Sequence, residues 1–170
     1  MIFELTDEQK LVQETAREFA HNDIAPTLVE EEKNHEFRLD RVARMGELGF
    51  FSCGVPEELG GTGFGFMESV LMAEQIAKVS ASWRLPFNMQ NLGPALTVAK
   101  FGTEAQQHKF IPGWVAGTQI GFFGMTEPES GSDVASMKTV ARDMGDHWEL
   151  RGNKIWVSNA VEGDAGLLYV

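Results

Sequence analysis

Hydrophobic residues over the first two thirds of the chain recur every three to four positions, which is the period of an amphipathic helix. Thr6 and Gln9 form a capping box ahead of the first such run, because each side chain can bond a free backbone amide at a helix start. Thr103 and Gln106 repeat this pattern ahead of the last run. The spacing predicts a helical domain over residues 1–117 with about six helices, near 7–22, 26–32, 39–48, 66–79, 80–101 and 103–117.

Short alternating segments separated by glycine turns replace the helical period after Gln119. Gly145-Asp146 and Gly152-Asn153 are two-residue hairpin signals, so strands are expected near 139–142, 147–150 and 154–158, and residues 166–170 are interpreted as a buried strand. The predicted fold class is α+β, in which the helical domain precedes the first part of a small antiparallel β-domain over residues 118–170. An open sheet edge leaves donors and acceptors unpaired, so we expect this domain to be truncated or completed by a partner.

Composition narrows the possible partners. Of the 170 residues 43% are hydrophobic, which is enough for a core, and 25 acidic against 14 basic side chains give a net charge of −11. Nucleic-acid binding needs clustered lysine and arginine, so no such partner is expected. The run Glu30, Glu31 and Glu32 is interpreted as a solvated face, because it lacks the alternating carboxylates and histidines of a metal site.

Cys53 is the only cysteine, so the sequence predicts neither an intrachain disulfide nor a zinc–thiolate site. It lies in an apolar stretch and is interpreted as a small buried hydrophobic residue rather than a catalytic thiol. The first eight residues lack the basic and apolar regions of a signal peptide, and no stretch is long enough to span a bilayer. These features favour a reducing, cytoplasmic compartment.

A glycine-rich loop at 55–65 can be compared with the dinucleotide-binding pattern G-x-G-x-x-G. When the pattern starts at Gly61 or Gly63, Phe66 or Glu68 replaces its third glycine, and no strand precedes it. The loop is therefore not interpreted as a dinucleotide site.

The candidate chemistry lies where the two patterns meet, in residues 121–133. Pro128 ends an apolar run, because proline lacks a backbone donor and holds its predecessor extended. The Ser-Gly-Ser sequence at 130–132 offers flexible backbone, free amides and hydroxyls, which can together bind an anion. Trp156 and Ser158, two positions apart on a predicted strand, can present an indole and a hydroxyl to one ring. The alternative is that the tryptophan belongs to the strand core and the hydroxyls cap turns.

Two segments in this order resemble the paired signature of flavin-dependent acyl-CoA dehydrogenases. They are Met-Thr-Glu-Pro-Glu-Ser-Gly-Ser-Asp at 125–133 and Leu-Arg-Gly-Asn-Lys-Ile-Trp-Val-Ser-Asn-Ala at 150–160. The resemblance extends along the chain through residues 7–9, 46–50 and 56–61. It implies FAD as the cofactor, and a flavin needs an apolar wall for its ring and donors at the ring edge.

The resemblance also implies roles for individual residues. Trp156 would pack on the flavin, and Ser158, where threonine is commoner in the family, would bond near the reactive nitrogen of the ring. Backbone and hydroxyl groups of the first motif would contact the flavin, namely those of Phe123, Met125, Thr126, Gly131 and Ser132. Ser132 would also lie near the CoA part of the substrate. For Phe123 and Met125, contact through the backbone alone stays open.

The reaction implied by the family is α,β-dehydrogenation of an acyl-CoA thioester. A carboxylate removes the α-proton, the β-hydrogen leaves as hydride to the flavin, and the electrons pass to electron-transferring flavoprotein. Members of the family form homotetramers. The base of the family is a glutamate well beyond the β-domain, to which no residue of this chain corresponds, so we assign no catalytic base. Glu127 is interpreted as a structural part of its turn.

The segments 84–93, 122–128 and 136–137 are closer to the glutaryl-CoA dehydrogenase branch than to straight-chain members. Arg84 would then pair with a second carboxylate on the acyl chain; an exposed arginine at a helix start is the alternative. A branch that acts on alicyclic acyl-CoAs would show much the same sequence. A non-catalytic flavin- or acyl-CoA-binding subunit completed by another chain, and a helical interaction domain, are the other classes of function left open.

Overall fold

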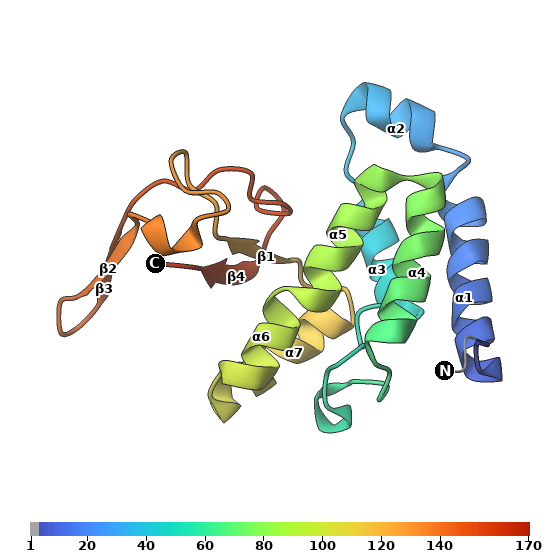
Figure 1. The fold of residues 1–170 in the computed structure, drawn as a ribbon, viewed down its shortest axis with the longest axis horizontal. Helices are drawn as coiled ribbons and strands as arrows, with labels where there is room; N and C mark the ends of the chain where they lie inside the picture. The colour runs from blue at the N-terminus through green and yellow to red at the C-terminus, as the bar shows by residue number, and fades with distance from the viewer. Residues whose placement is uncertain (1–3) are drawn as a thin grey trace.

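The computed structural model describes residues 4–170; residues 1–3, which begin the segment assessed for a signal peptide, lie outside the described part. Figure 1 shows the helices gathered on one side of the molecule and the β structure on the other. The helices are α1 (Asp7–Phe19), a π-helical continuation (Ala20–Ile24), α2 (Leu28–Asn34), α3 (Leu39–Glu47), α4 (Phe66–Val79), α5 (Ala81–Leu92), α6 (Pro94–Phe101) and α7 (Glu104–Val115).

The strands are β1 (Gly121–Gly124), β2 (Val140–Asp143), β3 (Trp148–Arg151) and β4 (Ala165–Leu168), with short 3₁₀ turns at Glu57–Leu59 and Val134–Ser136. The predicted α+β class is confirmed. Within residues 4–170, every helix is too short or too polar to cross a bilayer.

Both predicted capping boxes are present. The Thr6 hydroxyl accepts from the Gln9 amide at 3.1 Å, and the Gln9 side chain accepts from the Thr6 amide at 3.1 Å. The Thr103 hydroxyl accepts from the Gln106 amide at 3.3 Å, and the return bond is 2.8 Å. Each cap satisfies helix-end donors and contributes about 1 kcal/mol, so α1 and α7 begin where the sequence predicts.

Aromatic side chains fill the core between α1, α3 and α5. The Phe50 ring meets Phe19 edge-on at 5.4 Å between centroids and Phe87 at 6.4 Å. Cys53 is buried in the same cluster. Burial, and to a smaller extent the charge of Glu68, raises the pKa of the Cys53 thiol to about 12. The interpretation of Cys53 as a buried hydrophobic residue is confirmed.

The single helix predicted over 80–101 is wrong, because α5 and α6 meet at Gly93. Gly93 has φ −80° and ψ −108°, outside the helical region, and a β-carbon there would lie 2.4 Å from the carbonyl oxygen of Met89. Pro94 follows at the first position of α6, where its missing N–H has no helical partner to lose. Beyond this break, α6 contacts β1.

The sequence suggested that the acidic run on α2 is a solvated face, but one of its three glutamates is buried. Glu31 is buried and accepts from both terminal nitrogens of Arg41 on α3, at 2.7 Å for the Nη2–Oε1 pair. Arg41 also donates to the Asp23 carbonyl at 2.7 Å and lies 4.5 Å from the centre of the Trp83 ring. The bonds from Arg41 lower the pKa of Glu31 to about 2. Of the three glutamates in the run, only Glu30 and Glu32 are exposed to solvent.

The strands form two separate pairs. β2 and β3 are antiparallel, as the turn at Gly145 predicts, whereas β1 and β4 are parallel. β4 was expected to be buried, but its residues alternate between half-buried and exposed. The predicted strand at 154–158 is wrong, since Trp156 and Asn159 have left-handed backbones with φ of 57° and 64°. An L-residue in that region cannot continue a pleated strand.

One buried amide joins the helices to the β structure. Gln90 on α5 is 1% exposed, and its Nε2 donates to the carbonyls of Trp114 at 2.8 Å and Gln119 at 2.7 Å. Its Oε1 accepts from the amide of Gly121 at 2.8 Å. Gln90 therefore sets where β1 starts and where the residues that follow β1 lie.

Candidate functional site

The Thr-Glu-Pro turn after β1 is organised around the Glu127 carboxylate. Glu127 is 6% exposed and accepts from the amides of Lys138 at 2.7 Å and Thr139 at 3.0 Å, and from Lys154 Nζ at 2.8 Å. The Lys154 ammonium, with the donors of Thr139 and Lys138, lowers the pKa of Glu127 to about 2. Both oxygens are occupied, and the carboxylate stays ionised, so this geometry supports a structural part for Glu127.

The two sequence motifs lie side by side through their backbones. The amide of Ile155 donates to the carbonyl of Thr126 at 2.9 Å. Lys154 Nζ donates to the carbonyl of Met125 at 3.1 Å. Residues nearly 30 positions apart in the sequence therefore meet at one turn, as a shared cofactor site requires.

The Ser-Gly-Ser corner is an open turn. The amide of Glu127 donates to the carbonyl of Ser130 at 2.9 Å, and the Ser130 hydroxyl donates to the carbonyl of Asp133 at 2.7 Å. Ser130 is thus used internally. Gly131 and Ser132 are exposed, and a β-carbon on Gly131 would meet no atom within 4 Å. The corner keeps an open side at the two positions predicted to contact a ligand.

Trp156 and Ser158 do not share the face of a strand, because the segment that carries them is irregular. The Trp156 side chain is 85% exposed, and Ser158 is half-buried. Asn159 then donates to the carbonyl of Gly121 at 3.2 Å, which returns the chain to β1. The strand argument for these two residues was wrong, yet the indole is left open to a planar ligand.

Phe123 and Met125 are held by the protein itself. The Phe123 ring packs edge-on against Tyr169, at 6.2 Å between centroids, and lies near Gly93. The Met125 carbonyl is bonded to Lys154. For Phe123, contact with a ligand through the backbone alone, which the sequence left open, is the simpler arrangement.

Arg84 is half-buried on α5, and none of the ion pairs within residues 4–170 includes it. Asn88 lies one turn later on the same face, and its Oδ1 is buried with no hydrogen-bond partner in the described chain. Sequence reasoning missed Asn88; its four-residue spacing from Arg84 is the signal that could have found it. A buried acceptor without a partner is costly, so a ligand group that donates a hydrogen bond to this oxygen is favoured there.

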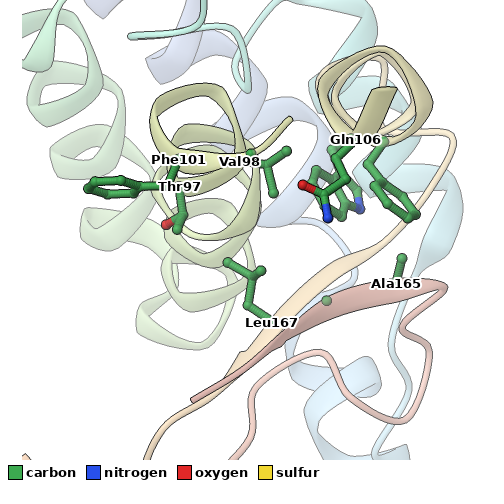
Figure 2. A pocket seen from close by; sticks show the side chains of 10 residues that line it. Thr97, Val98, Phe101, Gln106, Ala165 and Leu167 are labelled. Atoms are coloured by element: carbon green, nitrogen blue, oxygen red, sulfur yellow. The ribbon is translucent and has the colours of Figure 1, made fainter. Parts of the chain in front are cut away.

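An apolar cavity of about 260 Å³ lies between α6, α7 and β4. Figure 2 shows Leu167 of β4 facing Thr97 of α6 across it. Its lining residues include neither a charged side chain nor any residue predicted to contact the flavin. It therefore lacks a cationic group to bind a phosphate, and its lining is separate from the two motifs.

The chain matches two families of protein domain. Residues 6–118 match the acyl-CoA dehydrogenase N-terminal domain, and residues 122–170 match the acyl-CoA dehydrogenase middle domain. Among curated relatives, glutaryl-CoA dehydrogenase from Desulfococcus multivorans is 39% identical over 172 residues, which cover 99% of this chain and 44% of that protein.

Solved structures of the same family have the same fold. A glutaryl-coenzyme A dehydrogenase in complex with glutaryl-CoA superposes with a TM-score of 0.96 at 39% identity, over 100% of this chain and 44% of the other. An acyl-CoA dehydrogenase from Bacillus anthracis complexed with FAD superposes with a TM-score of 0.89 at 31% identity, over 96% of this chain and 28% of the other. The chain spans less than half the length of these relatives.

Proposed function

Because the chain belongs to the acyl-CoA dehydrogenase family, we propose that it forms the flavin-facing part of an FAD-dependent oxidoreductase acting on the CH–CH bond of an acyl-CoA thioester. Bound FAD would supply the acceptor for the hydrogen that leaves the acyl chain, and electron-transferring flavoprotein would take the electrons. The observation that carries this proposal is the contact between the two motifs, in which Lys154 and Ile155 bond the carbonyls of Met125 and Thr126.

The described residues fit a flavin. The exposed indole of Trp156 offers an apolar wall, and the hydroxyls of Thr126 and Ser158 lie on the two adjoining segments as donors for a ring edge. Gly131 and Ser132 leave an open corner that suits a phosphate or the CoA portion of a substrate. Each residue implied by the family resemblance is therefore retained in the proposal, with Phe123 and Met125 acting through their backbones.

No residue of this chain is proposed as the catalytic base. Glu127 directly follows Thr126, one of the predicted flavin contacts, but its two oxygens already accept three donors. Its pKa of about 2 makes it a poor acceptor of an α-proton, because a general base works best with a pKa near the operating pH.

The proposed substrate is a dicarboxylic acyl-CoA, for which Arg84 and Asn88 would bind the distal carboxylate. Arginine binds a carboxylate through two parallel hydrogen bonds, and the amide of Asn88 can add a third donor from the next helical turn. The lack of an ion pair at Arg84 within residues 4–170 supports this assignment.

A flavin titration tests the cofactor site. The double variant Trp156→Ala, Ser158→Ala removes the exposed ring and one hydroxyl, and is expected to weaken FAD binding by about tenfold, as measured by flavin fluorescence. Trp148→Ala is the matched control, because Trp148 is an exposed tryptophan on the β2–β3 hairpin. FAD affinity equal to that of the control would sink the assignment of this segment.

Turnover of a panel of thioesters with an artificial electron acceptor tests the activity. The panel contains straight-chain, alicyclic and dicarboxylic acyl-CoAs. Arg84→Met is expected to raise KM for the dicarboxylic thioester by at least about tenfold and to leave KM for the straight-chain one unchanged. Preferred turnover of the alicyclic thioester would contradict the substrate proposal. Flavin binding without any turnover would favour a non-catalytic binding subunit, and a protein without flavin would favour an interaction domain.

The organisation of the protein is proposed on two grounds: the oligomeric state follows the family resemblance, whereas the domain division and the location follow the sequence pattern and the single cysteine. We propose a division into domains at 1–117 and 118–170, a homotetramer and a cytoplasmic location. Light scattering coupled to size-exclusion chromatography measures the oligomeric state directly, and a monomer at micromolar concentration would contradict that part of the proposal.

A further inference from the structure

A buried ion pair joins the two motifs. Lys154 and Glu127 have side chains that are 9% and 6% exposed, and the Nζ–Oε1 distance is 2.8 Å. Lys154 Nζ also donates to the carbonyl of Met125 at 3.1 Å and lies 3.5 Å from the sulfur of Met137. The ammonium is therefore enclosed by three partners on two different segments.

The carboxylate is also bonded by the two residues that follow Met137. Glu127 accepts from the backbone amides of Lys138 and Thr139, which lead into β2. Residues 125–127, 138–139 and 154–155 thus converge on one buried pair of charges, which we name the Glu127–Lys154 clamp. A buried ion pair is weak evidence for stability, because desolvation offsets much of its attraction, but it holds a single geometry when every partner is satisfied.

The clamp adjoins the predicted flavin contacts. Met125 and Thr126 directly precede Glu127, and Trp156 follows Lys154 by two positions. Trp156 has φ of 57°, a left-handed conformation that costs an ordinary residue about 1–2 kcal/mol. Such a backbone persists only when its surroundings hold it, and the anchors before it are Lys154 and the Ile155–Thr126 bond.

We propose that Glu127 and Lys154 are positioning residues for the flavin: they hold the Thr-Glu-Pro turn and the strained Trp156 segment at the spacing that one ring requires. This inference rests on the proposed function. Neither side chain needs to touch the flavin, since each acts through the backbone atoms that it bonds. Loss of the clamp therefore separates the donors of the first motif from the indole of the second.

Three variants of the purified protein test this proposal. Lys154→Met removes the charge, Glu127→Gln places an amide donor against two backbone donors, and Lys154→Arg keeps the charge. For each variant we measure the Kd for FAD by fluorescence, the visible spectrum of the bound flavin and the melting temperature without FAD. Lys154→Met and Glu127→Gln are expected to raise the Kd on the order of 10- to 100-fold and to shift the flavin spectrum. Lys154→Arg is expected to recover most of the affinity.

Lys78→Met is the matched control. The Lys78 side chain is exposed and pairs with the exposed Glu74 on α4, in the helical part of the chain. This variant loses an ion-paired lysine charge outside the clamp, so its Kd and flavin spectrum should equal those of the parent protein.

The outcomes separate the two proposals. Equal Kd and flavin spectrum in Glu127→Gln, Lys154→Met and the parent would overturn the positioning role, even if the melting temperature falls, because the clamp would then be merely structural. If Lys154→Met does not fold, Glu127→Gln and Lys154→Arg decide the question by the same readouts. A parent protein that binds no FAD would instead overturn the proposed function, and the positioning role with it.

Discussion

Replacing Gln90 by methionine is expected to loosen the junction between the helices and the β structure. The substitution keeps the length and approximate volume of the side chain but removes three hydrogen bonds, to the carbonyls of Trp114 and Gln119 and from the amide of Gly121. All three bonds come from one amide that is 1% exposed. Water cannot readily replace them, so the partners that depend on Gln90 alone lose their bonds.

The size of the stability loss depends on which of the three bonded groups have a second hydrogen-bond partner. The Trp114 carbonyl also accepts from the amide of Gly117 at 3.2 Å, so its loss is small. The Gly121 amide and the Gln119 carbonyl depend on Gln90, and each buried group left unpaired costs about 1–3 kcal/mol. Methionine recovers part of this through its greater hydrophobicity. We expect the free energy of unfolding to fall by about 2–5 kcal/mol.

Urea unfolding followed by tryptophan fluorescence measures this change. The difference appears as a lower midpoint at an unchanged slope, since the surface exposed on unfolding stays the same. Gln13→Met on α1 is the matched control, because Gln13 is half-buried and its side chain bonds no residue between 4 and 170. The control is expected to change stability by less than about 0.5 kcal/mol.

A second variant separates the donors from the acceptor. Gln90→Glu keeps an acceptor for the Gly121 amide but places a carboxylate against two carbonyl oxygens. At pH 7 it should be at least as destabilising as the methionine variant. If both variants match the Gln13→Met control, the amide does not hold the junction, and the reasoning from its three hydrogen bonds is refuted.

Two further predictions concern buried titratable groups. Arg41→Met removes the buried charged partner of Glu31 and leaves it with the Thr27 hydroxyl and the longer contact to Arg38 at 3.5 Å, so the variant is expected to cost about 3 kcal/mol at pH 7. The folded-state pKa of Glu31 is lowered to about 2, so the stability from this pair is present above about pH 4.5 and is lost as the pH falls toward 2. In chemical denaturation, the difference in unfolding free energy between the Arg41→Met variant and the parent should therefore narrow over that range. Cys53, with its pKa raised to about 12, should resist a thiol reagent at pH 8 until the protein is unfolded; rapid reaction of the native protein would contradict its burial.

In the helical domain, local sequence patterns predicted some features correctly and missed others. The capping boxes at Thr6 and Thr103 act within one turn of the chain, so α1 and α7 begin as predicted. The break at Gly93 carried a local signal, the Gly-Pro pair, but helical spacing of apolar residues on both sides concealed it. No local signal in the sequence predicted the burial of Glu31, since its partner Arg41 lies ten positions away on another helix.

For the candidate site, too, the sequence predicted some features and missed others. Its two motifs, and through them the family, could be identified from residue types and order alone. The strand proposed for Trp156 and Ser158 failed, because the bonds of Lys154 and Ile155 to the preceding motif redirect the chain before Trp156. Asn88 became a candidate only when its Oδ1 proved to be buried without a partner.

The sequence by itself therefore determined where α1 and α7 start and which short motifs are present. These properties depend on groups three or four positions apart, whose separation is set by the geometry of the backbone. Only the tertiary structure decided that β4 pairs with β1 in parallel, that Gln90 holds the start of β1, and that Lys154 meets Glu127 across 27 positions. Such contacts depend on the path of the whole chain, because the entropy of closing a long loop is recovered only when many distant groups pack together.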